Sequence, residues 1–108
     1  MRTNPSEFVD SVRINDVIIS RATEEKLISK HRVQAYEVEE LFQESPRIEF
    51  VEKGRVTGQD LYIALGQTES QRYLSVFFIN KGKGKALIVT ARDMNATERK
   101  HYGKIRKT

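Results

Sequence analysis

The chain has 108 residues, which fits one compact domain with a modest core and leaves little room for a second domain. It has no cysteine, which excludes disulfides and thiolate metal sites, and no apolar run long enough to cross a bilayer. Its net charge of +4 is uneven, because residues 1–54 carry 8 Lys and Arg against 11 Asp and Glu, whereas residues 55–108 carry 11 against 4. This asymmetry favours an anionic partner such as nucleic acid. We expect a cytoplasmic protein with no signal peptide and no contact with a membrane.

The first predicted element is a short strand that follows a leader. We expect residues 1–15 to form a flexible leader and residues 16–108 to form one domain. Within Asp16–Ser20, three consecutive β-branched residues predict a strand.

Two helices are predicted to follow this strand. Thr23 can cap the first, whose opening turn is acidic as the helix dipole favours, and we expect it to end near His31 or Arg32. The second has an apolar stripe made of Ala35, Val38, Leu41 and Phe42. Its acidic residues are expected to face water: Glu37, Glu39, Glu40 and Glu44. The Ser45-Pro46 pair ends this helix.

After Pro46 the apolar period changes from helical to alternating, which is typical of strands. Four strands are predicted, around Ile48–Phe50, Leu61–Leu65, Tyr73–Ile79 and Ala86–Ala91. The last is almost entirely apolar and is expected mid-sheet. Asn95 and Glu98 then form a capping box that opens a basic helix reaching about Lys107. The predicted fold is α+β, with an antiparallel four-stranded meander sheet, two N-terminal helices and one C-terminal helix.

The segment around the last helix has the side chains that RNA cleavage requires. The sequence shows no metal-ligand cluster, phosphate-binding glycine loop or nucleophilic triad, so we expect no metal and no cofactor. RNA supplies its own 2′-OH nucleophile, so the protein needs only an acid, a base and cations for the phosphate. Arg92 ends the last strand, and Arg99 and Tyr102 share one side of the helix. An alternative is a solvated basic helix with Tyr102 and Ile105 packed on the sheet.

Several motifs, in this order and spacing, resemble the BrnT family of toxins from Asn15 onward. Lys30-His31 followed by a Glu-rich helix ending in Leu41-Phe42 resembles the family's KHG(V/I)…EEA…VF segment. The strand Gln59–Gly66 resembles its GE…R/L…LG strand. Ala86–Arg92 resembles a strand ending in (I/V)(I/T)SAR, and Thr97–Tyr102 resembles the closing xERRxY.

The resemblance implies a RelE-like fold and a metal-independent endoribonuclease that inhibits translation as the toxin of a type II toxin–antitoxin system. It also implies an RNA substrate and a BrnA-like antitoxin with a ribbon-helix-helix element, through which alone the pair would bind operator DNA. The family residues carried over are Lys30, His31, Arg92, Glu98, Arg99 and Tyr102.

We assign catalytic roles to five of these residues. Arg92 and Arg99 would stabilise the phosphorane, His31 is the leading acid or base, and Tyr102 or Glu98 is its complement. His31 can approach the arginines only if the first helix packs beside the last. The expected RNA-binding residues are lysines: Lys30, Lys81, Lys83, Lys85, Lys100, Lys104 and Lys107.

Two departures from the family pattern bear on activity. Arg32 replaces the usual glycine after Lys-His, which argues against a turn with positive φ. Ile19-Ser20 replaces an opening Trp-Asp. A catalytically inactive relative therefore stays open as an alternative. So does a basic RNA-binding module, which needs stacking aromatics among Tyr62, Tyr73 and Phe77, although Phe77 is expected in the core. A third alternative is a partner-binding protein that uses the acidic helix Gln34–Glu44.

Overall fold

The computed structural model of the chain describes residues 12–107, with side chains as far as Ile105. In chain order its elements are β1 (Asp16–Ile18), α1 (Arg21–Lys26), the π-helical turn η3 (Leu27–His31), α2 (Ala35–Gln43), β2 (Arg47–Glu52), β3 (Leu61–Gln67), β4 (Tyr73–Gly82), β5 (Lys85–Asp93) and α3 (Ala96–Lys107). Residues 1–11 of the expected leader lie outside the described residues, whereas Val12 and Ile14 pack against the core. The α+β class is as predicted.

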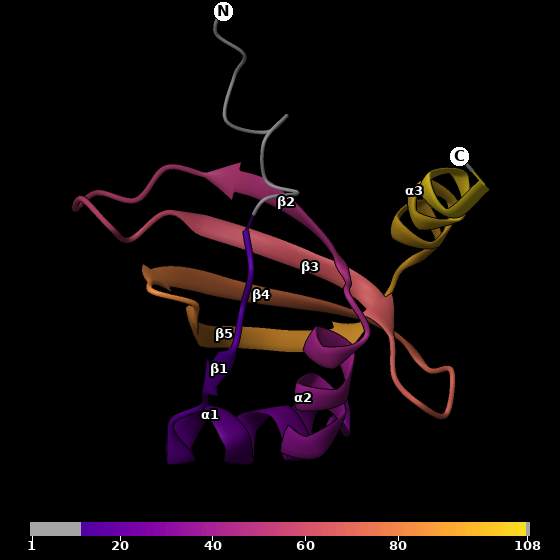
Figure 1. The fold of residues 1–108 in the computed structure, drawn as a ribbon. Helices are drawn as coiled ribbons and strands as arrows, with labels where there is room; N and C mark the ends of the chain where they lie inside the picture. The colour runs from indigo at the N-terminus through magenta and orange to yellow at the C-terminus, as the bar shows by residue number, and fades with distance from the viewer. Residues whose placement is uncertain (1–11, 108) are drawn as a thin grey trace, which may run out of the picture.

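The sheet has five strands in the order β1-β5-β4-β3-β2 (Figure 1). Strands β2 to β5 form the predicted antiparallel meander, and β5 lies inside the sheet as expected. The predicted four-stranded sheet needs correction, because the first predicted strand joins it: β1 pairs in parallel with β5 and places Val17 opposite Ala86. The amides of Asn15 and Asp16 donate to the Gly84 carbonyl at 2.7 and 2.9 Å and anchor this pairing.

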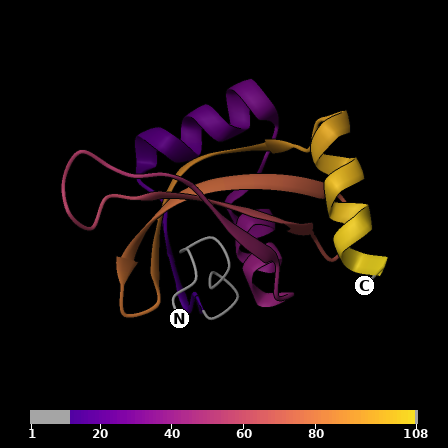
Figure 2. The same ribbon diagram turned by 90° about the horizontal axis from the view of Figure 1, so that it is seen from above.

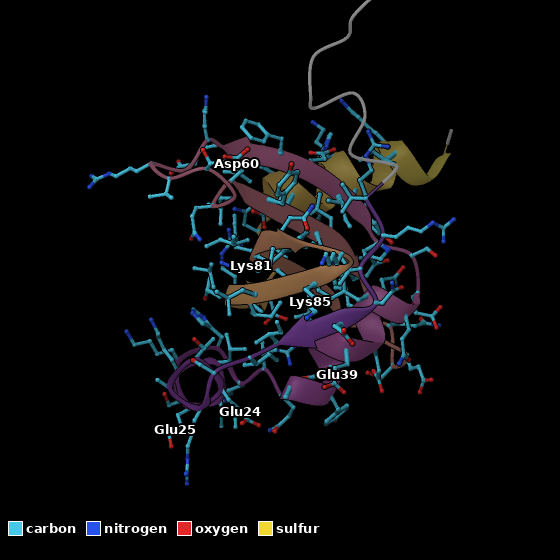
Figure 3. All side chains as sticks on the ribbon, turned by 60° about the vertical axis from the view of Figure 1, so that its left-hand side comes forward. Glu24, Glu25, Glu39, Asp60, Lys81 and Lys85 are labelled. Carbon is cyan, nitrogen blue, oxygen red and sulfur yellow. The ribbon has the colours of Figure 1, made fainter. Side chains whose placement is uncertain are left out.

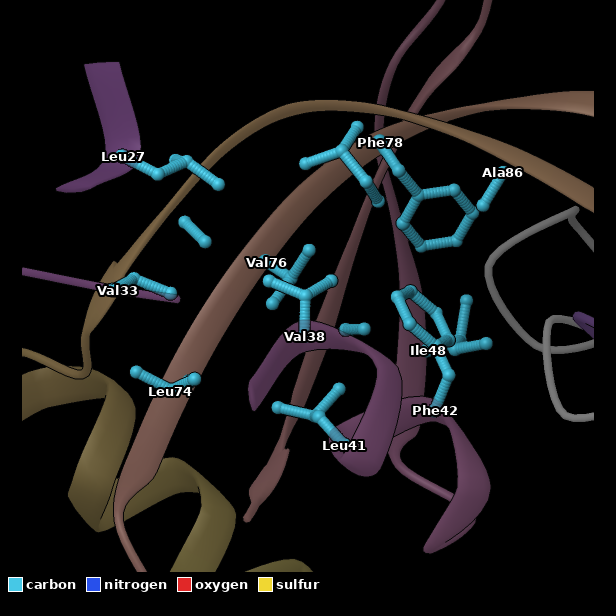
Figure 4. Close-up of a cluster of buried hydrophobic side chains, with 13 residues drawn as sticks. Leu27, Val33, Val38, Leu41, Phe42, Ile48, Leu74, Val76, Phe78 and Ala86 are labelled. Atoms are coloured by element: carbon cyan, nitrogen blue, oxygen red, sulfur yellow. The ribbon is translucent and has the colours of Figure 1, made fainter. Parts of the chain in front are cut away.

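The helices cover the two faces of the sheet unequally (Figures 1 and 2). Helices α1 and α2 lie on one side of the sheet, and α3 stands across the ends of the strands on the other side. The face under α1 and α2 carries the main core, to which β4 contributes Leu74, Val76 and Phe78 (Figure 4). Successive residues of a strand point to opposite faces, so these three side chains alternate with Tyr73, Ser75 and Phe77.

Among the described elements, α3 alone covers the opposite face, at one end of the strands (Figures 1 and 2). There Leu65 of β3, Met94 and Tyr102 form a second small buried cluster, against which Ile63 packs. Phe77 was expected in the core but is only half-buried, because β4 alternation turns it to this open face. Tyr62, in contrast, stacks on Phe78 in the main core with ring centroids 5.8 Å apart.

The predicted start of the first helix also needs correction. Ser20, not Thr23, is the N-cap, and its hydroxyl accepts a hydrogen bond from the Thr23 amide at 3.1 Å. The helix continues as η3 to His31, as predicted, and ends where Arg32 adopts a left-handed conformation with φ +55°. The expectation that Arg32 disfavours positive φ is therefore wrong for this turn. A left-handed non-glycine residue costs about 1–2 kcal/mol, so contacts elsewhere must hold the turn.

Candidate functional site

Helix α3 begins immediately after the end of β5, at a capping box that the sequence predicted. The Glu98 amide donates to Asn95 Oδ1 at 2.8 Å, and the Asn95 amide donates to Glu98 Oε1 at 2.9 Å. This reciprocal pair satisfies two amides that a helix start would otherwise leave free. It also fixes the Glu98 carboxylate close to the last residues of β5.

The Glu98 carboxylate forms a bidentate ion pair with Arg92. Arg92 Nη1 and Nη2 donate to Glu98 Oε1 and Oε2 at 2.7 and 2.9 Å. Ser75, opposite Arg92 in the sheet, donates its hydroxyl to Glu98 Oε1 at 2.8 Å. Arg92 Nη1 also donates to the Asp93 carbonyl at 3.2 Å, and the guanidinium lies 5.4 Å from the Phe77 ring centroid. The structure thus brings together Arg92 and Glu98, which the sequence assigned to one site.

These contacts decide the protonation state of Glu98. Burial alone would raise the pKa of this carboxyl, but hydrogen bonds from Arg92, the Asn95 amide and Ser75 outweigh burial and lower the pKa to about 2. The side chain is therefore ionised at neutral pH, with no proton to donate. The same ion pair raises the pKa of Arg92, chiefly through the hydrogen bond to Glu98.

Arg99 is held differently, by stacking on an aromatic ring. Its guanidinium carbon lies 3.6 Å from the centroid of Tyr73, the first residue of β4. Tyr73 in turn meets the Tyr102 ring edge-on, with centroids 6.0 Å apart. Tyr102 is buried, in a small cluster with Leu65 and Met94. Among the described side chains, Arg99 has no acidic partner within ion-pair distance, and its residue is exposed. Its cation therefore faces solvent above Tyr73.

His31 and Lys30 lie on the other side of the sheet from this group. They end η3, which packs against β5 within the helix layer. The first helix does not pack beside the last, because α1 and α3 lie on opposite sides of the sheet (Figure 1). His31 is half-buried and Lys30 is exposed. One residue that the sequence analysis did not identify contacts both the His31 backbone and Asp93, next to Arg92.

That residue is Arg72, which directly precedes β4. Its guanidinium contacts the carboxylates of Glu37 and Asp93 and the backbone carbonyls of His31 and Arg32, at 2.7–3.3 Å. Glu37 was expected to face water, but it is buried because it accepts from Arg72 and from the Gln34 amide at the start of α2. Helical periodicity alone could not predict that Glu37 both caps the start of α2 and pairs with Arg72.

The expected RNA-binding lysines fall into separate groups. Lys81, Lys83 and Lys85 are exposed at the hairpin between β4 and β5, whereas Lys100 and Lys104 are exposed on α3. Strand β4 runs between the two groups, and its ten residues span about 30 Å. In Figure 3, Lys81 and Lys85 lie on the hairpin, and the acidic Glu24, Glu25 and Glu39 lie on the helices. The side chain of Lys107 lies outside the described ones.

A second contact joins α3 to the far edge of the sheet. His101 Nε2 lies 2.8 Å from Glu49 Oε2 of β2, and Arg47 Nε also donates to that oxygen at 3.3 Å. His101 thus makes a polar contact with Glu49 that joins α3 to β2.

Within the described part of the chain, no three acidic or histidine side chains gather as a metal group would require. Among the described helices, none is long and apolar enough to cross a membrane.

A family model matches most of the chain, and a solved structure shares its fold. The family model described as ribonuclease toxin, BrnT, of type II toxin–antitoxin system matches residues 21–98. The crystal structure of the ribonuclease toxin BrnT from Brucella abortus matches with a TM-score of 0.54 and 15% identity. The match covers 74% of this chain and 96% of that one, and it shows a shared fold. No curated protein matches the chain.

Proposed function

The chain belongs to the BrnT family of ribonuclease toxins of type II toxin–antitoxin systems, and on that premise we propose that it is a metal-independent endoribonuclease that inhibits translation. Family membership implies an RNA target and an antitoxin partner in general terms. The observation that best supports cleavage is that two differently held arginines come from the junction of β5 and α3: Arg92 is paired with Glu98, and Arg99 is an exposed cation on Tyr73.

The reaction we propose uses the nucleophile within the RNA. The 2′-oxygen forms a bond to phosphorus while the bond from phosphorus to the 5′-oxygen breaks. A base on the protein takes the 2′-OH proton, and an acid gives a proton to the leaving 5′-oxygen. The products are a 2′,3′-cyclic phosphate and a 5′-hydroxyl. Extra negative charge develops on the non-bridging phosphate oxygens, so cations there accelerate the step.

Arg99 and Arg92 are the proposed phosphate ligands, with unequal shares. Arg99 has a full positive charge that no described acidic side chain offsets, and Tyr73 holds its plane. Three N–H groups of Arg92 donate to Glu98 and to the Asp93 carbonyl. Its Nε–H and one Nη2–H stay open for a phosphate oxygen. Arg99 therefore supplies charge, and Arg92 supplies oriented donors.

His31 stays the proposed acid or base even though α1 does not pack beside α3, because Arg72 links the His31 backbone to Asp93, next to Arg92. One of two α3 residues would complement it. Because the pKa of Glu98 is about 2, this carboxylate can only accept a proton and is a weak base. Tyr102 is therefore the proposed donor of the two. The exposed lysines would hold the RNA backbone, with Lys30 near His31 and the hairpin and α3 groups at opposite ends of the sheet. Lys107 extends the α3 group in the sequence.

The partner we propose is a BrnA-like ribbon-helix-helix antitoxin, and operator DNA would be bound only through it. The site of action would be the cytoplasm. Induced expression should stop growth, and co-expression of the adjacent gene product should relieve the arrest. Normal growth with confirmed folded protein would instead indicate the catalytically inactive relative.

Cleavage is tested with purified protein and RNA in the presence and absence of EDTA. We expect cleavage to persist in EDTA and to leave 2′,3′-cyclic phosphate ends. His31→Ala should reduce the rate by roughly 10²-fold, since general acid–base groups contribute 10²–10⁴-fold. Normal cleavage by His31→Ala would remove His31 from the mechanism, and 3′-hydroxyl products would overturn the 2′-OH pathway altogether.

A further inference from the structure

Resting on this proposed function, we propose that Arg72 is a positioning residue that fixes the His31 turn relative to Arg92. The two proposed groups belong to different layers, because η3 packs on one side of β5 and Arg92 meets α3 on the other. Some rigid connection must therefore set their separation. Arg72 contacts the backbone of His31 and the residue next to Arg92 at the same time.

The guanidinium of Arg72 has no donor left for a substrate. Its Nε and Nη2 donate to the two oxygens of Asp93 at 2.7 and 3.3 Å. Its Nη1 donates to Glu37 at 3.0 and 3.2 Å and to the Arg32 carbonyl at 2.8 Å. The remaining Nη2 proton goes to the His31 carbonyl at 3.2 Å. All five N–H groups are thus engaged within the protein, which separates Arg72 from a phosphate ligand.

On the helix side, Arg72 completes the end of η3. The last carbonyls of a helix have no partner within it, and the left-handed Arg32 turns the chain away. Arg72 supplies hydrogen bonds to the carbonyls of both His31 and Arg32. The direction in which the His31 side chain leaves the backbone is consequently tied to the plane of this guanidinium.

On the sheet side, the same group holds the end of β5. Asp93 receives two hydrogen bonds from Arg72 through its carboxylate, and its own carbonyl receives one from Arg92 at 3.2 Å. A planar fork transmits orientation in a way that a single flexible ammonium cannot. Displacements near 1 Å can cost about 10²-fold in rate, so this link matters for catalysis even without touching RNA.

The test compares Arg72→Lys with Arg47→Lys, a matched replacement of another half-buried arginine that pairs with a carboxylate on the same sheet. We expect Arg72→Lys to lower kcat about tenfold or more with KM nearly unchanged, because binding groups stay and geometry changes. Arg47→Lys should leave both constants near wild type. If Arg72→Lys does not fold, Asp93→Asn weakens the sheet arm alone and should show the same split between kcat and KM.

Two further readouts separate positioning from general stability. In a kinetic cycle, His31→Ala with Arg72→Lys should be no slower than His31→Ala alone, because Arg72 acts through His31. Independent additive losses would overturn the proposal. In NMR spectra, the His31 ring signals should shift in Arg72→Lys while those of His101, the other histidine, stay in place. This second readout stands even if the wild-type protein cuts no RNA, and an unmoved His31 signal would refute the link.

Discussion

Arg72 and Arg99 both lie near Tyr73, at the start of β4, but their charges and hydrogen-bond donors have different surroundings. Arg72 is three-quarters buried, shares its charge with two carboxylates and has every donor engaged within the protein. Arg99 is exposed, lies flat on Tyr73 and has no acidic partner among the described side chains. The comparison shows that an arginine's role follows from its donors and partners and not from its presence near a site.

Arg92 is intermediate between these two. Its ion pair with Glu98 cancels its charge, as the carboxylates do for Arg72, but two N–H donors stay open. The three arginines therefore form a series: Arg72 has every donor engaged within the protein, Arg92 has two donors open, and Arg99 is exposed with no described acidic partner.

The largest expected effect is on stability and separates Arg72 from Arg99. Arg72→Ala would leave the buried Glu37 carboxylate without its cation, so we expect unfolding to become easier by about 3 kcal/mol. Arg99→Ala removes one stacking contact at an exposed position and should cost less than about 1 kcal/mol. Urea titration of both variants measures the difference. Equal losses would contradict the distinction between the two arginines.

Cleavage rates should reverse that order. Arg99→Ala and Arg92→Ala should each lower RNA cleavage by roughly 10²-fold or more, since they remove donors aimed at the developing charge. Melting temperature should barely move for Arg99→Ala. Single-turnover rates on one RNA provide the measurement, with Arg21→Ala as a control in an exposed pair with Glu25. A smaller loss for Arg99 than for Arg21 would remove Arg99 from the site.

The pH dependence of stability tests the state of Glu98. Its pKa in the folded protein, about 2, lies below the ordinary value of 4.5, so its stabilisation is present above pH 4.5 and is lost as pH falls toward 2. Relative to wild type, Glu98→Gln should be less stable by about 2 kcal/mol at neutral pH, and the gap should shrink through that window. Parallel stability curves from pH 5 to pH 2 would show that the carboxylate is not held ionised.

The smallest effects are expected at the lysines. If the hairpin and α3 groups contact phosphates, RNA affinity should fall steeply as salt rises. Lys83→Ala and Lys104→Ala should each reduce the slope of log K against log salt by about one unit or less. About 30 Å of β4 separates the two groups. The affinity of an RNA too short to span that distance should therefore respond to substitutions in one group only. An affinity unaffected by salt would argue against this RNA path.

Local patterns in the sequence predicted the parts of the site that are local in the chain. The Asn95–Glu98 capping box and the position of Arg92 at a strand end follow from short-range spacing. Arg72 could not be found in this way, because its partners Glu37 and His31 lie 35 and 41 residues away. The same partners explain two incorrect expectations, the solvent-facing Glu37 and the disfavoured left-handed Arg32.

The fold shows a similar division. Alternation predicted the four meander strands because neighbouring strands follow one another in sequence. Periodicity located β1 but could not supply its partner, since a parallel pairing joins distant segments. The open face exposing Phe77 was also missed, because periodicity does not say which face the helices will cover.

The parallel pairing of β1 with β5 has a consequence for synthesis on the ribosome. Asp16 leaves the ribosome first, and its partner Lys85 follows 69 residues later in the chain. The sheet therefore cannot close until all the residues between them have been synthesised. Because α3 directly follows β5, the ribosome completes the sheet and the arginine group at nearly the same moment. A nascent chain stalled before Lys85 should accordingly be cut readily by protease.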